Sequence, residues 1–245
     1  GNAAVKPLKK AIRNGSDLQR VNAGWALGRI DSNGNADTLR AALKDASPDV
    51  RIAAARMLGL AKVEGAANDL VAALKDEHPA VRRQAATALG QIGVVKTAEP
   101  VLAACAAAVD RFEEHALIYT VIQLGAEDAA RAALQDSEAP VRKAALIALD
   151  QMNGGRLQKE ELVPFLNATD ESLRKSGLWV ASRHPEWSDV VVDLLNQGLR
   201  TADLDGNDVQ ALRDVLLAYA NDAGVQAMVP ALLADPAFDA PRRLF

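Results

Sequence analysis

Apolar and small residues recur along the chain with the spacing of an α-helix. Counted from an arginine, positions +3, +4 and +7 are apolar or small in every unit, as Ala54, Ala55 and Leu58 are after Arg51. These positions share one face of a helix and would not share one face of a strand. A proline often precedes the arginine in the first turn, where its missing N–H costs nothing. The pattern therefore predicts an amphipathic helix that begins near each arginine.

The same helix recurs along most of the sequence. Successive arginines are 31, 31, 60 and 32 residues apart, and we expect His115 to fill the slot that the gap of 60 leaves empty. A shorter segment with one apolar face precedes each motif, as at 39–43 and 70–74. One such helix pair cannot bury its apolar face alone, so neighbouring pairs must stack. The arginines of this series are Arg20, Arg51, Arg82, Arg142 and Arg174.

The repeat predicts an all-α protein, an α-α superhelix of about seven and a half helix pairs. Because the period is uninterrupted, we expect residues 1–245 to form a single array. The sequence lacks an initiator methionine, and residues 233–242 begin another motif just before the chain ends. We therefore expect an excised fragment of a larger protein, monomeric as a fragment.

The repeating unit Leu-x-Asp-x-x-Pro-x-Val-Arg-x-x-Ala-Ala-x-x-Leu-Gly, clearest at 43–59, resembles the HEAT repeat. The resemblance is to the short bacterial form called phycobilisome-lyase-like HEAT, and it covers nearly the whole chain. It implies a structural ladder of hydrogen bonds between the motif aspartates and arginines along the stack. The residues to which this ladder carries over are Asp45, Asp76 and Asp136 with Arg51, Arg82 and Arg142.

Two further phrases, at 110–119 and 178–187, resemble the HEAT segment of very large secreted proteins of planctomycete-type bacteria. Such proteins join a sugar-dehydrogenase-like propeller, HEAT repeats and a c-type haem domain. The resemblance implies an extracytoplasmic or periplasmic location, although the sequence itself indicates no compartment. The haem-attachment motif Cys-x-x-Cys-His is absent, because Cys105 is the single cysteine. No haem or other cofactor is therefore assigned to this chain.

Composition and charge narrow the classes of function that the chain can have. The formal net charge of −4 argues against bulk nucleic-acid binding, which needs a basic surface. No stretch approaches the ~18 consecutive apolar residues of a membrane span, so we expect no membrane insertion. Aromatic residues are only 4% of the chain, which fits thin alanine-rich helix pairs rather than a thick globular core. Cys105 lies on an apolar helix face and is predicted to be a buried, inert thiol.

No constellation for catalysis or metal binding stands out. The three histidines lie in separate loops or repeats, and none is followed by glutamate. We therefore predict no catalytic residues and no metal centre. The loops at Asp31 and Asp203 alternate oxygen-bearing side chains as a calcium loop does, but both lack the sixth-position glycine and twelfth-position glutamate. Both are interpreted as turns, and calcium binding is left open.

One surface of the second helices carries the functional prediction. Positions +1, +5 and +9 from each arginine lie away from the core positions and hold many cations and no carboxylate. We expect them to line the concave side as a strip for an acidic peptide, a sugar acid or a neighbouring domain. The alternative is a solvated face with snorkelling side chains. The partner-binding candidates are Trp25, Arg29, Arg56, Arg83, Lys143, Lys175, Trp179 and Arg183.

The function that follows is non-catalytic: a bacterial scaffold that binds a protein or orients neighbouring domains of the same chain. Two alternatives remain open. One is an accessory domain of a secreted multidomain dehydrogenase or cytochrome-like protein, which the two phrases at 110–119 and 178–187 favour. The other is a bilin-lyase-like enzyme, which the type of repeat alone favours.

Overall fold

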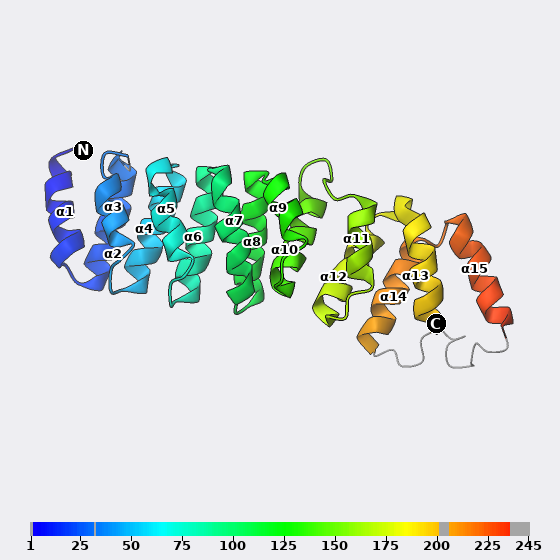
Figure 1. Cartoon of the computed structure of the whole chain (residues 1–245). Coiled ribbons are helices and arrows are strands. Elements are labelled where there is room, and N and C mark those ends of the chain that lie inside the picture. The colour runs from blue at the N-terminus through cyan, green and yellow to red at the C-terminus, as the bar shows by residue number, and fades with distance from the viewer. Residues whose placement is uncertain (1, 32, 201–205, 236–245) are drawn as a thin grey trace. The chain divides into compact units, whose positions relative to one another are not determined.

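The computed structural model of the protein describes residues 2–31, 33–200 and 206–235. All regular structure in these residues is helical, and they contain no strand (Figure 1). The prediction of an all-α, HEAT-like solenoid fold is confirmed. Helices α1 to α14 form seven successive pairs and α15 follows singly, so the expected seven and a half helix pairs match the described residues.

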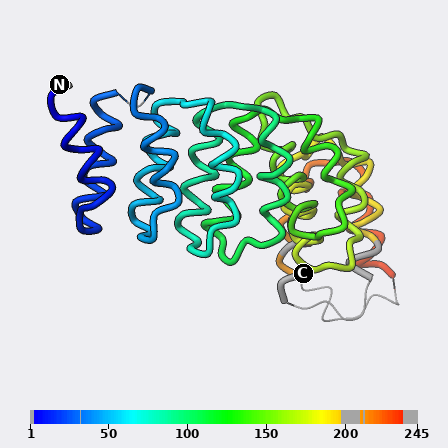
Figure 2. The backbone as a smooth tube through the Cα atoms, turned by 60° about the vertical axis from the view of Figure 1, so that its left-hand side comes forward, coloured from blue at the N-terminus to red at the C-terminus, as the bar shows by residue number. Residues whose placement is uncertain are grey.

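The helices divide between two compact units, Gly1–Gly154 and Gly155–Phe245. The expectation that 1–245 forms one array stays a prediction. In the first unit the helix pairs stack side by side in chain order, which Figure 2 shows from a second direction. The helices of the first unit are α1 (Val5–Asn14), α2 (Asp17–Asp31), α3 (Ala36–Ala42), α4 (Pro48–Leu60), α5 (Ala67–Ala73), α6 (Pro79–Ile92), α7 (Ala98–Ala104), α8 (Arg111–Leu124), α9 (Glu127–Ala133) and α10 (Ala139–Gln151).

The second unit continues the alternation of first and second helices. Short 3-10 turns lead into or out of several helices in both units. The helices of the second unit are α11 (Lys159–Leu166), α12 (Glu171–Ser182), α13 (Ser188–Arg200), α14 (Gly206–Ala218) and α15 (Ala223–Ala234). The 3-10 turns are η1 (Asn2–Ala4), η2 (Glu64–Ala66), η3 (Val95–Thr97), η4 (Cys105–Ala107) and η5 (Pro185–Trp187).

Local sequence explains where the second helices begin and end. Proline opens α4 and α6 in the first turn, as the sequence predicts. Asp110 caps α8 instead, because its Oδ1 accepts hydrogen bonds from the N–H groups of Phe112 and Glu113, each at 2.8 Å. Gly93 and Gly125 end α6 and α8 in the left-handed conformation that glycine tolerates best.

Small residues let the second helices approach closely. Ala54, Ala55 and Leu58 of α4 are buried, which agrees with the predicted +3, +4 and +7 core positions. A Cβ atom added to Gly59 would lie only 2.7 Å from the Cα of Ala88 on α6. Because no side chain larger than hydrogen fits there, Gly59 sets the distance between α4 and α6.

The fourth repeat has a different register from the one expected. Gly59 faces the Gln91 amide on α6, and Gly90 faces the Gln123 amide on α8. Gln123 is thus equivalent to Gln91, 32 residues later, which places Glu114 in the arginine slot. The expectation for His115 was wrong by one position, because this repeat lacks both the arginine and the proline that mark the others.

An ion-pair ladder runs along the loops that precede the second helices, in which Arg20, Arg51 and Arg82 are each bonded to the next repeat. Arg51 Nη2 donates to Asp76 Oδ1 at 2.8 Å, and its Nε lies 2.7 Å from Oδ2. Arg20 pairs with Asp45 in the same way, with 3.0 Å between Nε and Oδ2. Asp45, Asp76 and Arg51 therefore belong to the ladder, as the resemblance implied.

The ladder departs from that expectation in its later members. Arg82 reaches the buried Glu113, with Nη2 2.8 Å from Oε2 and Nε 2.5 Å from Oε1. Arg142 donates to the backbone oxygens of Asp136 and Ser137 of its own loop. The reason lies in the fourth repeat. Ala108 stands there at the position of Asp45 and Asp76, and Glu114 takes the slot from which an arginine would reach Asp136.

In the second unit, a tyrosine joins two successive second helices. Tyr219 follows α14 directly and is almost fully buried. Its hydroxyl lies 3.2 Å from the Ala181 carbonyl of α12 and also donates to the His184 carbonyl. Burial raises the pKa of this phenol, so it stays a neutral donor at physiological pH. Lys159 and Asp189 add an ion pair between α11 and α13.

Candidate binding face of the second helices

The exposed side chains of the second helices recur with the repeat and form, in each unit, a surface that we call the second-helix face. It consists of positions +1, +5 and +9, counted from the arginine slot of helices α2, α4, α6, α8, α10 and α12. These positions are partly or fully exposed in all six helices. The predicted strip residues all lie at these positions. Whether the face is concave stays a prediction.

Positions +3, +4 and +7 of these six helices are buried without exception, so each helix presents a core side and an exposed side. The division is strict because side chains three and four residues apart share one side of a helix. The residues of the face at +1 are Val21, Ile52, Arg83, His115, Lys143 and Lys175. Those at +5 are Trp25, Arg56, Thr87, Tyr119, Ile147 and Trp179. Those at +9 are Arg29, Leu60, Gln91, Gln123, Gln151 and Arg183.

Large aromatic side chains stand at the +5 positions in both units. Trp179 is 45% exposed and Tyr119 is 52% exposed, whereas Trp25 is half-buried. The guanidinium of Arg56 lies over the ring of Trp25, 5.2 Å from its centroid, and joins α2 to α4. Tyr119 stacks along α8 with His115, with 6.4 Å between the ring centroids. These rings present flat, rigid contact area to solvent.

The cations of the face differ in whether a carboxylate neutralises them. Lys143 lies 2.7 Å from Glu114, and both side chains are about three-quarters buried, so this charge is satisfied within the protein. Lys175 pairs with Glu171 one turn earlier on α12. Arg29, Arg56 and Arg83 are exposed and have no ion pair within the described ranges. The net positive charge of the face in the first unit therefore comes from these arginines.

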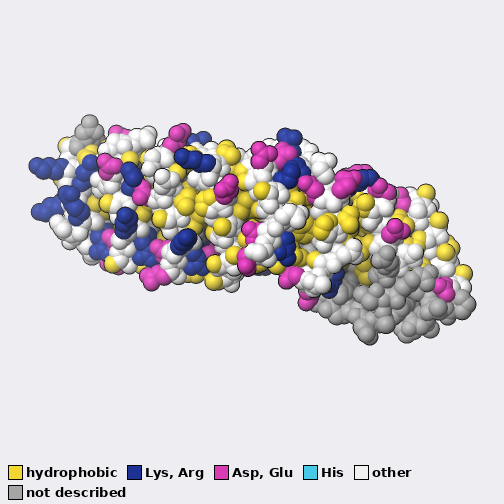
Figure 3. All heavy atoms as spheres, in the orientation of Figure 1, with side chains coloured by type: hydrophobic (Ala, Val, Ile, Leu, Met, Phe, Trp, Pro, Cys, Tyr) yellow, Lys and Arg dark blue, Asp and Glu magenta, His cyan; other side chains and the backbone are white. Residues whose placement is uncertain are grey.

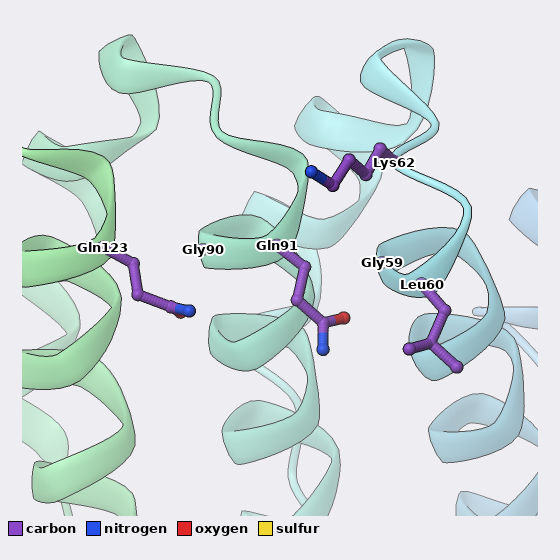
Figure 4. A pocket seen from close by; sticks show the side chains of 6 residues that line it. All are labelled: Gly59, Leu60, Lys62, Gly90, Gln91 and Gln123. Carbon is purple, nitrogen blue, oxygen red and sulfur yellow. The ribbon is translucent and has the colours of Figure 1, made fainter.

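A recess opens near the C-terminal ends of α4, α6 and α8. It has a volume of about 350 Å³ and is lined by glycines and amides. Figure 4 shows Gln123 pointing from α8 toward Gly90, and Lys62 extending from the loop after α4. Gly59 and Gly90 leave the room, because neither carries a side chain. The lining residues are Gly59, Leu60, Lys62, Gly90, Gln91 and Gln123.

Lys62 has an unusual backbone for its residue type. Its φ of 51° is left-handed, and it is the one non-glycine residue with positive φ in the described chain. Gly93 and Gly125 occupy the equivalent positions after α6 and α8, with φ of 82° and 58°. A side chain in this conformation costs about 1 kcal/mol. The Lys62 backbone is therefore strained, and its ammonium group lies beside the recess.

In the second unit, α12 carries its own part of the face. Trp179 and Arg183 are one turn apart, and the Arg183 guanidinium lies 5.1 Å from the centroid of the Trp179 ring. This contact holds the guanidinium over an exposed ring. The predicted strip residues Lys175 and Trp179 thus lie on α12, and Arg183 is the residue that caps its C-terminal end. Their role in binding stays a prediction.

The remaining sequence candidates lie elsewhere. No three metal-ligating side chains come together in the part of the chain that is described. His184 stacks on Trp187, with 3.8 Å between centroids, and its Nδ1 lies 2.7 Å from Glu186 Oε1. Cys105 is buried, and burial raises its pKa to about 12. It is therefore a thiol at neutral pH, and a poor nucleophile.

The first of the two candidate calcium loops is a turn held by its own side chains. Asp31 Oδ1 accepts the N–H of Gly34 at 2.9 Å, and the side chain of the buried Asn35 donates to the Asp31 carbonyl at 2.7 Å. Such bonds are typical of turns rich in Asp and Asn. The loop at Asp203 lies outside the described residues.

None of the described helices is both long enough and apolar enough to cross a bilayer.

Comparison with known proteins identifies the repeat. Residues 36–122, which span α3 to α8, match the family model of HEAT repeats. This part of the chain consists of HEAT repeats. A search of curated protein sequences finds no match. The matched HEAT repeats include those that carry the ion pairs of Arg51 and Arg82.

Solved structures are similar to this chain at low sequence identity, and one of the following three has a TM-score above 0.5. An archaeal HEAT-like repeat protein from Thermococcus onnurineus is 13% identical with a TM-score of 0.51, over 91% of this chain and 97% of that one. The phycocyanin lyase complex of CpcE and CpcF from a Nostoc species is 20% identical with a TM-score of 0.49, over 86% and 93%. Human deoxyhypusine hydroxylase is 20% identical with a TM-score of 0.45, over 96% and 91%.

Sequence reasoning missed the HEAT repeat at α8 as part of the face. His115, Tyr119 and Gln123 occupy its +1, +5 and +9 positions. The apolar pattern left the register open, because Ile118 and Ile122 would take positions +3 and +7 if His115 held the arginine slot. No signal within a single repeat marked Lys62, whose left-handed φ became visible only in the structure.

Proposed function

We propose that this HEAT-repeat chain is a non-catalytic scaffold whose second-helix face binds a polypeptide, either from a partner protein or from a neighbouring domain of the same chain. One observation carries the proposal. The face combines exposed aromatic rings at position +5 of α8 and α12 with exposed arginines on α2, α4 and α6, and it contains no carboxylate, although the chain has 32 Asp and Glu residues. Tryptophan, tyrosine and arginine are the residue types that dominate protein interfaces.

The chemistry of the face favours binding over catalysis. Its side chains are mainly aromatic rings, guanidinium groups and amides, which make contact area and hydrogen bonds but do not act as activated nucleophiles. The recess lined by Gly59, Gly90 and Lys62 is large enough for one side chain of a bound segment. Each repeat exposes side chains at the same three positions of its second helix, so a bound chain can cross several helices and gain affinity from each.

A peptide library displayed on phage tests the proposal. Peptides selected on the wild-type protein should bind it in solution and should protect amides of α4, α6 and α8 from hydrogen exchange. Replacing Tyr119 with serine should weaken their binding at least about fivefold, since an exposed ring at an interface contributes on the order of 1 kcal/mol or more.

A matched control comes from an apolar side chain elsewhere on the same unit. Val95 is 53% exposed on the turn η3 and does not belong to the second-helix face. Replacing Val95 with serine should leave the affinity of the selected peptides unchanged. Protection confined to α3, α5 and α7, or equal losses in both variants, would refute the proposed binding face.

A further inference from the structure

Four exposed arginines form an oblique line across four successive second helices of the first unit. They occupy position +9 on α2, +5 on α4, +1 on α6 and the first residue of α8, so each step moves one helix along the stack and one turn toward the helix N-terminus. We call this set the arginine diagonal. Its members are Arg29, Arg56, Arg83 and Arg111.

These arginines are unlike those of the arginine slot, which donate hydrogen bonds to the loops that precede their helices. All four are exposed, and none forms an ion pair with any residue that the structure describes. Two are held by aromatic rings: Arg56 lies over Trp25, and Arg111 lies over Phe112 at 4.9 Å from its centroid. A guanidinium stacked on a ring keeps its N–H edge free and loses less freedom when it binds a carboxylate.

The spacing of the diagonal follows from the close packing of the helices. Helices that touch through glycine lie about 8–9 Å apart, and one turn along the axis adds about 6 Å. Successive arginines are therefore about 10 Å apart. A polyproline II segment rises about 3.1 Å per residue with three residues per turn, so every third side chain points the same way at about 9 Å intervals.

The distribution of charge along the chain also favours an anion at the diagonal. Residues 1–100 contain 15 Lys and Arg against 10 Asp and Glu, whereas residues 101–245 contain 13 against 22. In Figure 3 the Lys and Arg side chains are densest over the N-terminal helices. Because the acidic excess lies in the other part of the chain, most of the arginine diagonal belongs to the basic part of an acidic protein.

We propose that the arginine diagonal binds an extended acidic segment of a partner protein, with a carboxylate at about every third residue facing Arg29, Arg56, Arg83 and Arg111. This inference rests on the proposed function and names the chemistry of the partner. Each guanidinium donates two N–H groups to one carboxylate. The neighbouring ring of Trp25 packs against the backbone and apolar side chains of the segment.

A polypeptide fits this surface better than a nucleic acid. Exposed carboxylates flank the diagonal at the N-terminal end of the second helices, among them Asp49, Glu77 and Asp110. A nucleic-acid strand carries one charge about every 3.4 Å and would bring phosphates against them. A polypeptide places its carboxylates only opposite the arginines and can leave neutral residues beside the acidic loops.

The test measures the binding of a labelled peptide of about 15 residues that has glutamate at every third position among proline and serine. Fluorescence anisotropy at low and at physiological salt gives its affinity for the wild-type protein. The same peptide with glutamine in place of glutamate should bind at least about tenfold more weakly, since two or more charge-assisted contacts are lost. Binding of the glutamate peptide should weaken as salt rises.

A pair of charge-reversal variants provides the matched control. The double variant Arg56→Glu, Arg83→Glu changes two residues of the diagonal. It should weaken the binding of the glutamate peptide at least about tenfold. Lys44→Glu together with Lys75→Glu makes the same change of charge at two exposed lysines that follow first helices, and should weaken it less than about threefold. Circular dichroism and thermal unfolding check that both variants are folded.

The outcomes separate this inference from the proposed function. Equal losses of affinity in the two double variants would refute the proposal of an acidic segment. No binding of the glutamate peptide to the wild type would also refute it. A single-stranded oligonucleotide that binds more tightly than the peptide, and depends on Arg56 and Arg83, would also overturn it. If library peptides still bind through Tyr119 while the glutamate peptide does not, the proposed function stands and the acidic partner is wrong.

Discussion

Arg82 and Arg83 are neighbours in the sequence and belong to two different regions of the molecule. Arg82 points along the loops that precede the second helices, a region that we call the loop edge. Its guanidinium reaches the buried carboxylate of Glu113 and the carbonyl of Asp76 there. Arg83 points out on the second-helix face and has no ion pair in the described structure. Residue type alone therefore does not tell whether an arginine stabilises the fold or remains available to a partner.

The difference comes from where each position lies on the helix. The arginine slot adjoins the next repeat, so a carboxylate can come within 3 Å of it and the pair is shielded from water. One residue further, the side chain has turned about 100° and faces solvent. Ion pairs of the loop edge therefore contribute to the stability of the fold. The exposed cations of the face add little to stability and keep their hydrogen-bonding groups available to a partner.

The largest expected effect separates the two arginines directly. Arg82→Ala should lower the free energy of unfolding by about 3 kcal/mol, because it leaves the carboxylate of Glu113 buried without its partner. Arg83→Ala should change it by no more than about 0.5 kcal/mol. Chemical denaturation of both variants measures the contrast. Equal effects would mean that the loop edge and the face do not differ in this way.

The close approach of the second helices gives the next effect. Gly59→Ala should cost about 2 kcal/mol, because the new methyl group would meet the backbone of Ala88. Gly90→Ala should cost less, since its methyl group meets mainly the flexible Gln123 side chain. Thermal unfolding of both variants tests the order. A larger loss for Gly90→Ala would contradict the packing that sets the spacing of the arginine diagonal.

The pH dependence of stability sharpens the same comparison. Burial alone would raise the pKa of Asp76, but hydrogen bonds from Arg51 and from the His78 N–H outweigh it and lower that pKa below its usual value. The unfolded chain thus binds this proton at higher pH, so the stabilisation is present above about pH 3.9 and is lost as pH falls through the folded pKa.

Asp76→Asn should therefore be less stable than the wild type at pH 7 by about 1–2 kcal/mol, and the gap should close below about pH 4. Asp49→Asn is the control, because Asp49 is exposed and has no ion pair in the described chain. Denaturation curves measured from about pH 7 to about pH 2.5 follow the difference across the carboxylate range. A gap for Asp76→Asn that does not change with pH would rule out the ladder as its cause.

The smallest effect concerns the strained residue beside the recess. Lys62→Gly should raise the free energy of unfolding by up to about 1 kcal/mol, because glycine adopts a positive φ without steric cost. Gly93→Lys places lysine in the equivalent left-handed position after α6 and should have the opposite effect. Differential scanning calorimetry resolves both shifts. A loss of stability in Lys62→Gly would mean that its side chain stabilises the fold.

The sequence by itself determined the helical repeat and the side of each second helix that is buried. Ala54, Ala55 and Leu58 could be assigned to the core because a helix places residues three and four apart on one side, whatever the fold around it. The same periodicity predicted that Trp179 and Arg83 lie off the core. These are local properties, which one repeat is enough to show.

Only the tertiary structure decided how residues of different repeats meet. The shift of register at α8, which places Glu114 in the arginine slot, depends on how α8 packs against α6 through Gly90 and Gln123. The partner of Arg82 became Glu113 for the same reason. A sequence motif fixes positions within one helix pair, whereas contacts between pairs depend on the length of each connecting loop and on the packing of side chains from both sides.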